Sequence, residues 1–210
     1  MMKYILRLFY TLIFVLSFIE LANSKTTKII FFGDSLIAGY GLKSEDNFVS
    51  QLELKTIENK INDVTLLNSG VSGETSTGLL NRYKWVLEDN YDGVIILIGA
   101  NDALRGIDPN LTSQNIEKIL SYLNEKQIPT MLIGMKAPNN LGEIYVNQFN
   151  AIYPKLSQKY HTAYYPFFLK DVALKPSLNQ RDMIHPNKKG VKIIVNNFFP
   201  YFFKFYESLK

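Results

Sequence analysis

One serine near the start of the chain and a carboxylate–imidazole pair near its end are the side chains best suited to catalysis. Ser35 lies in the sequence GDSL, directly after the apolar run 29–32, and Asp182 and His185 lie in the sequence DMIHP. A serine hydroxyl is a weak nucleophile until a base takes its proton, and a carboxylate can orient the imidazole that serves as this base. The three residues therefore predict attack by Ser35 on an acyl carbon, with His185 as base and Asp182 as orienting acid.

The choice of base follows from the small number of histidines. The chain has only two, and His161 lies in the polar segment 158–162, which leads into the last predicted strand. That position is at the amino end of a parallel sheet, whereas open parallel sheets bind their ligands at the carboxyl ends of the strands. We therefore expect His161 to be a surface residue and His185 to be the base.

Acyl transfer also needs hydrogen-bond donors for the negative oxygen of the tetrahedral intermediate. The candidates are the backbone N–H groups of Ser35 and Gly73 and the side-chain amide of Asn101. Gly73 permits close backbone approach because it has no Cβ, and Asn101 supplies a neutral donor. Each follows a predicted strand, so the topology brings these donors to one edge of the sheet.

Two further aspartates next to these residues are expected to be structural. Asp34 and Asp102 can each accept hydrogen bonds from backbone N–H groups in their own turns, and Asp182 already fills the acid role. A metal site is not expected, because the chain has no second histidine near His185 and no carboxylate cluster at ligand spacing.

The elements that position these residues alternate between apolar runs and helical patterns. Runs such as VIILI do not alternate polar with apolar residues, which is typical of parallel strands covered on both faces. The predicted strands are Lys28–Phe32, Val64–Asn68, Val94–Ile98, Thr130–Met135 and Ala163–Phe167. Alternation of strands with helices predicts a single α/β domain with a parallel sheet.

Apolar residues at helical spacing separate the strands and predict helices that pack on the sheet. The stripes are Leu80, Tyr83, Val86 and Leu87; Ile116, Ile119, Leu120 and Leu123; Tyr145, Phe149, Ile152, Tyr153 and Leu156; and Val191, Ile194, Val195 and Phe198. A further helix is expected near 46–59. Pro154 should kink the helix that contains it, and Asp108 with Pro109 forms a plausible helix start.

Composition limits the function classes. The chain has 210 residues, is 47% apolar, carries a formal net charge of +4 and contains no cysteine. Such a mild positive charge, with scattered lysines, argues against a nucleic-acid partner, and a cysteine nucleophile is excluded. Residues 1–24 join a basic start to a short apolar stretch and small residues, which predicts a cleaved signal peptide and an exported domain over 25–210, without a lasting membrane anchor.

Four sequence blocks taken together resemble the SGNH (GDSL) hydrolase family. They are GDSLIAGYG (33–41), GVSGET (70–75), GANDALRG (99–106) and DMIHPN (182–187). The resemblance places the family's serine, glycine, asparagine and histidine on Ser35, Gly73, Asn101 and His185, with its acid on Asp182. It implies a flavodoxin-like α/β/α sandwich of three layers, with a five-stranded parallel sheet in the order 2-1-3-4-5.

The resemblance also implies a serine esterase that needs no cofactor. The expected reaction is hydrolysis of carboxylic esters and thioesters through an acyl-enzyme, on small acyl substrates including aryl esters and lysophospholipids, by a monomer. The segments 103–108 and 136–143 follow strands on the same edge, so Ala103, Leu104, Ala137 and Pro138 are the predicted substrate-binding residues. Ala137 stands where a larger apolar residue is expected, which bears on acyl-chain preference.

Three other functions fit parts of the sequence. A carbohydrate O-acetylesterase of the same fold would have a pocket that admits only acetyl groups. A flavin- or nucleotide-binding module could use the glycine after the first strand to bind phosphate, although no dinucleotide fingerprint follows that strand. A non-catalytic binding protein could have kept the scaffold, although the intact Ser35, Asp182 and His185 argue against it.

Overall fold

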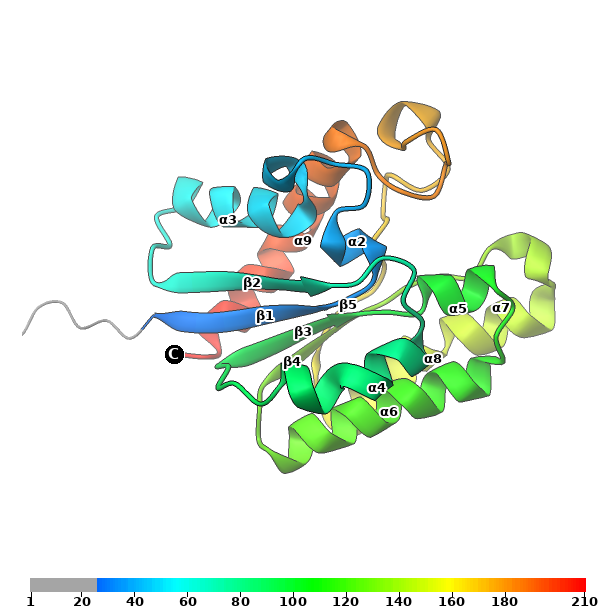
Figure 1. The fold of residues 1–210 in the computed structure, drawn as a ribbon, viewed down its shortest axis with the longest axis horizontal. Coiled ribbons are helices and arrows are strands. Elements are labelled where there is room, and N and C mark those ends of the chain that lie inside the picture. Colours follow the sequence, from blue (N-terminus) through cyan, green and yellow to red (C-terminus); the bar gives the residue numbers. More distant parts are fainter. Residues whose placement is uncertain (1–25) are drawn as a thin grey trace, which may run out of the picture.

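Five parallel strands form the centre of the computed structural model, which describes residues 26–210. They are β1 (Thr27–Gly33), β2 (Val64–Gly70), β3 (Gly93–Leu97), β4 (Thr130–Ile133) and β5 (Ala163–Tyr165). The strands form one sheet in the order β2-β1-β3-β4-β5 (Figure 1). This confirms the predicted order, although β4 and β5 each end two residues before their predicted ends.

Burial explains why the central strands read as continuous apolar runs. In β3 every residue is buried, and in β1 only Lys28 is exposed. Each of these strands has a neighbour on both sides, since β1 pairs with β2 and β3, and β3 also pairs with β4. Neighbouring strands cover the edges of β1 and β3, and helices cover both of their faces (Figure 1). Such strands have no solvent-facing positions for polar residues.

Helices cover both faces of the sheet and complete the predicted three layers. They are α2 (Ser35–Ala38), α3 (Phe48–Glu58), α4 (Ser76–Val86), α5 (Ala100–Leu104), α6 (Pro109–Glu125), α7 (Glu143–Asn150), α8 (Ile152–Tyr160) and α9 (Lys188–Glu207), with short 3₁₀ turns η1 (Ser44–Asp46), η2 (Asn139–Leu141) and η3 (Pro176–Leu178). α3 and α9 lie on one face, and α4, α6 and α8 lie on the other (Figure 1).

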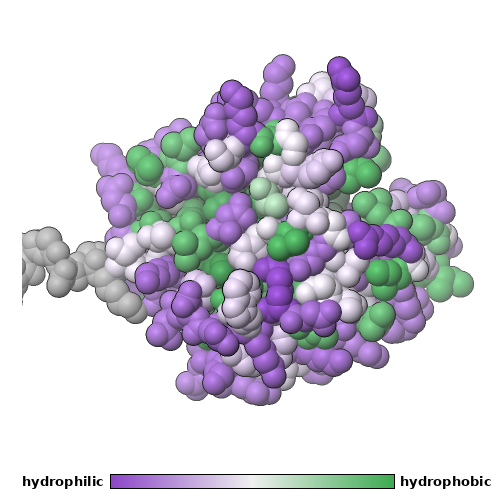
Figure 2. Space-filling view, viewed as in Figure 1, coloured by the Kyte–Doolittle hydropathy of each residue, from purple (hydrophilic) through white to green (hydrophobic). Residues whose placement is uncertain are grey.

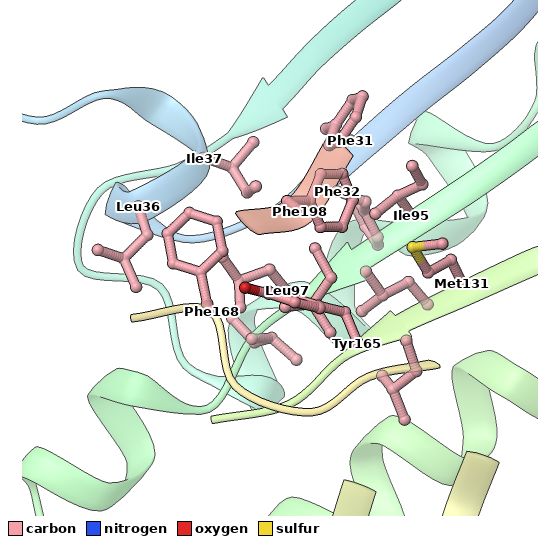
Figure 3. Packing of buried hydrophobic residues seen from close by; sticks show 14 of the residues in the cluster. Phe31, Phe32, Leu36, Ile37, Ile95, Leu97, Met131, Tyr165, Phe168 and Phe198 are labelled. Atoms are coloured by element: carbon pink, nitrogen blue, oxygen red, sulfur yellow. The ribbon is translucent and has the colours of Figure 1, made fainter. Parts of the chain in front are cut away.

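Aromatic side chains fill the layer between the sheet and the α3–α9 pair. The ring of Phe48 packs edge-on against Phe31, Phe168 and Phe198, with centroid distances of 5.8, 4.9 and 5.4 Å. Figure 3 shows Phe31, Phe168 and Phe198 in this interior, with Phe168 next to Leu36 of the segment that carries Ser35. Edge-to-face packing of large rings buries much apolar area, so this core gives the nucleophile segment a rigid base.

The region around Pro154 differs from the prediction of one kinked helix. The chain forms two helices, α7 and α8, which are separated at Ala151. Pro154 lies in the first turn of α8, where a missing N–H group breaks no helical hydrogen bond. Proline thus marks a helix start here. By contrast, Pro200 lies inside α9, whose aromatic carboxyl half packs on the core through Phe198, Phe202 and Phe205.

The predicted signal peptide, residues 1–24, lies outside the described residues. Between residues 26 and 210, no helix combines the length and the apolar character needed to cross a bilayer.

Candidate active site

Ser35, His185 and Asp182 form a continuous hydrogen-bonded chain. The Ser35 Oγ lies 2.8 Å from His185 Nε2, and His185 Nδ1 lies 2.7 Å from Asp182 Oδ2. The two segments meet at the carboxyl end of β1, although they come from opposite ends of the sequence. The structure therefore brings together all three residues that the sequence predicted as the triad, in the connectivity of a nucleophile, a base and an orienting acid.

The nucleophile is held at the start of a short helix. Asp34 is the N-cap of α2, its Oδ1 accepts a hydrogen bond from the Leu36 N–H at 3.0 Å, and Gly39 ends the helix in a left-handed conformation with φ of 81°. Gly33 is needed just before it, because a Cβ at that position would lie 2.1 Å from the carbonyl oxygen of Leu97 in β3. The turn after β1 can pass this close to β3 only with glycine.

The acid and base share one compact loop. Asp182 Oδ1 accepts hydrogen bonds from the N–H groups of Ile184 at 2.9 Å and His185 at 3.0 Å. Partial burial of Asp182 disfavours its ionisation, but these two bonds and the His185 ring together outweigh that penalty and lower the pKa to about 2. Asp182 is therefore an anion over the whole range in which the protein could function, ready to stabilise a protonated imidazole.

The two predicted oxyanion donors other than Ser35 lie in the segments that follow β2 and β3. Asn101 lies in the first turn of α5, and its Nδ2 donates to the carbonyl oxygen of Glu74 at 3.0 Å. One of its two amide hydrogens is used in this bond, so the other is available for a ligand. Gly73 lies in the loop after β2 with φ of +79°, and its carbonyl oxygen accepts from Arg105 Nη2 at 2.8 Å.

A large cleft opens next to the triad. Its volume is about 620 Å³, and both Ser35 and His185 lie on its wall. The lining is otherwise mostly apolar and comprises Leu36, Ala100, Asn101, Ala103, Leu104, Met135, Lys136, Ala137, Pro138, Asn139, Asn140, Phe167, Leu169, Ala173, Leu174, Asn179, Met183 and Ile184. All four predicted substrate-binding residues are in this lining.

Apolar side chains also reach the surface at this end of the molecule. Figure 2 shows them gathered over α5 and α7, where Leu104 and Ile144 are exposed. Leu174, at 83% exposure, and Ile184 lie on the side of the cleft that follows β5. The walls after β3 and β4 were predicted, whereas this third wall was not, because segment 167–174 has no helical or strand periodicity.

Comparison with known proteins agrees with this geometry. The profile of the GDSL-like Lipase/Acylhydrolase family matches residues 31–193. The chain belongs to this family. It is 34% identical to the arylesterase of Vibrio mimicus over 170 residues, which cover 80% of this chain and 84% of the relative. It is 33% identical over 169 residues to the thioesterase 1/protease 1/lysophospholipase L1 of Escherichia coli strain K12, which cover 80% and 79%.

A solved structure supports the same assignment. The SGNH-hydrolase family esterase AlinE4 is 41% identical and superposes with a TM-score of 0.72, covering 85% of this chain and 96% of AlinE4. As a member of this family, the chain is an ester hydrolase with the SGNH fold. These matches do not favour a nucleotide-binding module, a non-catalytic protein or a carbohydrate O-acetylesterase.

The two additional aspartates within the family blocks, Asp34 and Asp102, are buried. Asp34 caps its own turn, as predicted. Asp102 is structural, as predicted, but its hydrogen bonds reach other elements instead of its own turn. Its carboxylate accepts hydrogen bonds from the N–H and hydroxyl of Ser76 and from the hydroxyl of Thr112. Asp102 therefore joins α5 to α4 and α6 instead of capping a local turn, which fixes the segment that carries Asn101.

The protonation state of Asp34 differs from that of Asp182. Complete burial raises its pKa to about 7, and the negative charges of Asp102 and Glu74 add to this effect against the Leu36 hydrogen bond. Its second oxygen, Oδ2, has no hydrogen-bond partner. A protonated carboxyl group still caps α2 through Oδ1, so the family aspartate acts as a structural group here.

His161 is exposed and ends α8 in a left-handed conformation with φ of 51°, immediately before β5, so it lies at the amino end of the sheet. Within residues 26–210, no group of three or more acidic or histidine side chains is arranged to hold a metal ion.

Four residues with contacts around the site were not predicted from the sequence, namely Tyr40, Glu74, Arg82 and Gln180. The ring of Tyr40 packs against His185, Gln180 ties the Tyr40 and Pro186 carbonyl groups together, and Arg82 pairs with Glu74. Tyr40 and Glu74 lie inside the family blocks, which was the available signal. Gln180 and Arg82 lie outside them, and only the folded chain shows what they contact.

Proposed function

We propose that the chain is an exported serine esterase and thioesterase that cleaves acyl substrates through an acyl-enzyme on Ser35. One observation supports this most directly. The 2.8 Å contact between Ser35 Oγ and His185 Nε2 lies on the wall of an apolar cleft of about 620 Å³. A poised nucleophile beside an acyl-sized apolar space is suited to acyl transfer.

The proposed reaction begins when Ser35 Oγ attacks the acyl carbon and its proton passes to His185 Nε2. The resulting imidazolium is stabilised by the ionised Asp182 at its Nδ1 side. The tetrahedral oxygen accepts hydrogen bonds from the N–H groups of Ser35 and Gly73 and from Asn101 Nδ2. Collapse of this intermediate breaks the bond to the alcohol or thiol, which leaves with the proton held by His185.

Hydrolysis of the acyl-enzyme repeats these steps with water as the nucleophile. His185 takes a proton from the water while its oxygen attacks the acyl carbon, and the same donors hold the second oxyanion. When the bond between the acyl carbon and Ser35 Oγ breaks, His185 returns the proton to Ser35 Oγ and the carboxylic acid is released. Apart from the attacking water, side chains and backbone N–H groups of the protein supply every group that these two half-reactions use.

The cleft supports acyl groups longer than acetyl as the substrate class. Its apolar lining from Ala103 to Ile184 extends well beyond the space that an acetyl group fills. The named activities of the relatives from Vibrio mimicus and Escherichia coli are arylesterase and thioesterase 1/protease 1/lysophospholipase L1. We extend to this chain hydrolysis of aryl esters, acyl thioesters and lysophospholipids, by a monomer outside the cytoplasm.

A substrate panel on the purified protein tests the proposal. Wild type, Ser35→Ala and Asp182→Asn are each assayed on acetyl, medium-chain and long-chain p-nitrophenyl esters, an acyl thioester and lysophosphatidylcholine. We expect wild type to prefer acyl groups longer than acetyl, Ser35→Ala to lose turnover, and Asp182→Asn to lose about 10⁴-fold in kcat. Hydrolysis of acetyl esters alone would favour the O-acetylesterase, and full activity of Ser35→Ala would refute the mechanism.

A further inference from the structure

Arg82 on α4 makes a two-pronged ion pair with Glu74, the residue after Gly73. Arg82 Nε donates to Glu74 Oε1 at 2.7 Å, and Nη2 donates to Oε2 at 2.7 Å. The two side chains are only 19% and 6% exposed. A guanidinium that meets a carboxylate with two parallel hydrogen bonds fixes its orientation as well as its position. The loop after β2 is thereby fixed to α4 at one point.

The same guanidinium also holds the ends of two strands. Arg82 Nη1 donates to Ser69 Oγ at 3.0 Å, and Nη2 lies within hydrogen-bond distance of the carbonyl oxygens of Ser69 at 2.8 Å and Gly33 at 3.3 Å. The Cζ atom of Arg82 lies 4.4 Å from the centre of the Phe32 ring. Arg82 thus contacts β1 directly before the Asp34–Ser35 turn and β2 directly before the Gly73 loop.

Glu74 passes this constraint on to the predicted oxyanion donors. Its carbonyl oxygen accepts the hydrogen bond from Asn101 Nδ2 at 3.0 Å. The peptide before it carries the Gly73 carbonyl, which Arg105 holds from the other side. The backbone of Glu74 therefore orients the Asn101 amide, while its side chain is anchored by Arg82.

From these contacts we infer that Arg82 is a positioning residue for the oxyanion hole, acting through Glu74 on Asn101 and Gly73. This inference rests on the proposed function, because it assumes that these groups stabilise the tetrahedral oxygen. Donors in an oxyanion hole must be oriented before the reaction, since reorganisation during the step would add to the barrier. The Gly73 loop is irregular, with a local hydrogen bond from the Glu74 N–H to the Val71 carbonyl at 3.2 Å. Its conformation therefore depends on contacts with other elements, such as the ion pair between Arg82 and Glu74.

Lysine cannot replace the contacts that Arg82 makes with Glu74 and the two strand ends. Its ammonium is a single point charge on a flexible stem, whereas the planar fork of arginine holds Glu74 and the two strand ends at once. Arg82→Lys keeps a positive charge in a similar place and removes the two parallel hydrogen bonds to Glu74. We expect kcat for a p-nitrophenyl acyl ester to fall about 10- to 100-fold in this variant, with KM changed less than about threefold.

The measurement must separate a positioning role from a merely structural one. The kcat value is therefore calculated per active site, with the active fraction taken from complete fluorophosphonate labelling and intact mass. Lys159→Gln, which breaks the exposed Lys159–Glu117 ion pair between α8 and α6, is the matched control and should keep wild-type kcat. Arg82→Lys with wild-type kcat per labelled site would overturn the inference. A shifted midpoint in the pH–rate profile of Arg82→Lys would also overturn the inference, since Arg82 would then act on His185.

A second variant keeps the test valid if Arg82→Lys does not fold. Glu74→Gln preserves side-chain length and loses the charge, and it should lower kcat per site in the same direction. In an Asn101→Ala background, Arg82→Lys should cost less than it does in wild type, because one of its targets is absent. An equal loss in both backgrounds would contradict the route through Asn101. Full activity of Ser35→Ala would instead refute the proposed function, independently of Arg82.

Discussion

The ring of Tyr40 lies against the imidazole of His185, with centroids 4.7 Å apart and an angle of 40° between the planes. The two residues come from opposite ends of the sequence. Gln180 ties them together, because its Nε2 donates to the Tyr40 carbonyl oxygen at 2.7 Å and its N–H donates to that of His185 at 2.7 Å. Asp182 restrains the imidazole at Nδ1, and Tyr40 restrains it on one face, which leaves Nε2 directed at Ser35.

Replacing this ring should weaken catalysis without abolishing it. Aromatic contacts of this kind contribute about 0.5–1.5 kcal/mol, which corresponds to a two- to tenfold lower kcat/KM in Tyr40→Ala. Tyr40→Phe should keep the wild-type value, because the contact uses the ring and not the hydroxyl. Steady-state kinetics on a p-nitrophenyl ester compares the two. If Tyr40→Phe lost as much activity as Tyr40→Ala, the role would belong to the hydroxyl instead.

The side chain of Asn101 should act mainly in the transition state. Removing one oxyanion donor typically costs about 2.7–4 kcal/mol, so Asn101→Ala should lower kcat by about 10²–10³-fold and leave KM nearly unchanged. Asn59→Ala, which removes an exposed amide bonded to the Lys55 carbonyl at the end of α3, serves as the control and should match wild type. A raised KM with unchanged kcat would reassign Asn101 to substrate binding.

The size of residue 137 should set the preferred length of the acyl group. Ala137 lies on the cleft wall and is only 6% exposed. Its N–H is already fixed by the Asn150 side chain at 2.9 Å, so a larger side chain here would project from a rigid backbone. Ala137→Leu should lower kcat/KM for a long-chain ester by about tenfold or more relative to the acetyl ester, which is the internal control. An unchanged ratio across a chain-length series would place the acyl group elsewhere.

The buried Asp34 should make stability depend on pH in an unusual direction. Its pKa is about 7 in the folded protein against an ordinary 3.8, so the folded state binds the extra proton between these two values. The contribution of Asp34 to the free energy of unfolding should therefore be highest below about pH 4 and fall as the pH rises towards 7. For this one group the total change is of the order of 4 kcal/mol.

Asp34→Asn isolates this contribution, because asparagine keeps an oxygen for the Leu36 N–H but cannot ionise. Urea unfolding of both proteins at about pH 4, 5.5 and 7.5 gives the difference that matters, since the other titrating groups are shared. The disadvantage of wild type relative to the variant should grow with pH over this interval. Parallel curves would show that Asp34 is ionised in the folded protein.

Much of the fold follows from local patterns in the sequence. The run VIILI predicted β3 because a strand buried on both faces has only apolar positions, and the stripe from Ile116 to Leu123 predicted α6 for the corresponding reason in a helix. Pro154 was misread, because proline at a helix start and proline inside a helix give similar local patterns. Only the packing of α7 and α8 distinguishes the two.

Residue types and spacing were enough to predict the chemistry from the sequence, namely a serine nucleophile, one suitable histidine, an acid three residues before that histidine and the donors that follow the strands. These residues are recognisable because each needs a particular side chain or a glycine at a fixed place in a turn. Only the folded chain shows how far apart they lie, which residues form the third wall of the cleft and what Tyr40, Gln180 and Arg82 contact. Such contacts join segments distant in the chain, and no local spacing records which side chains will meet once the sheet has assembled.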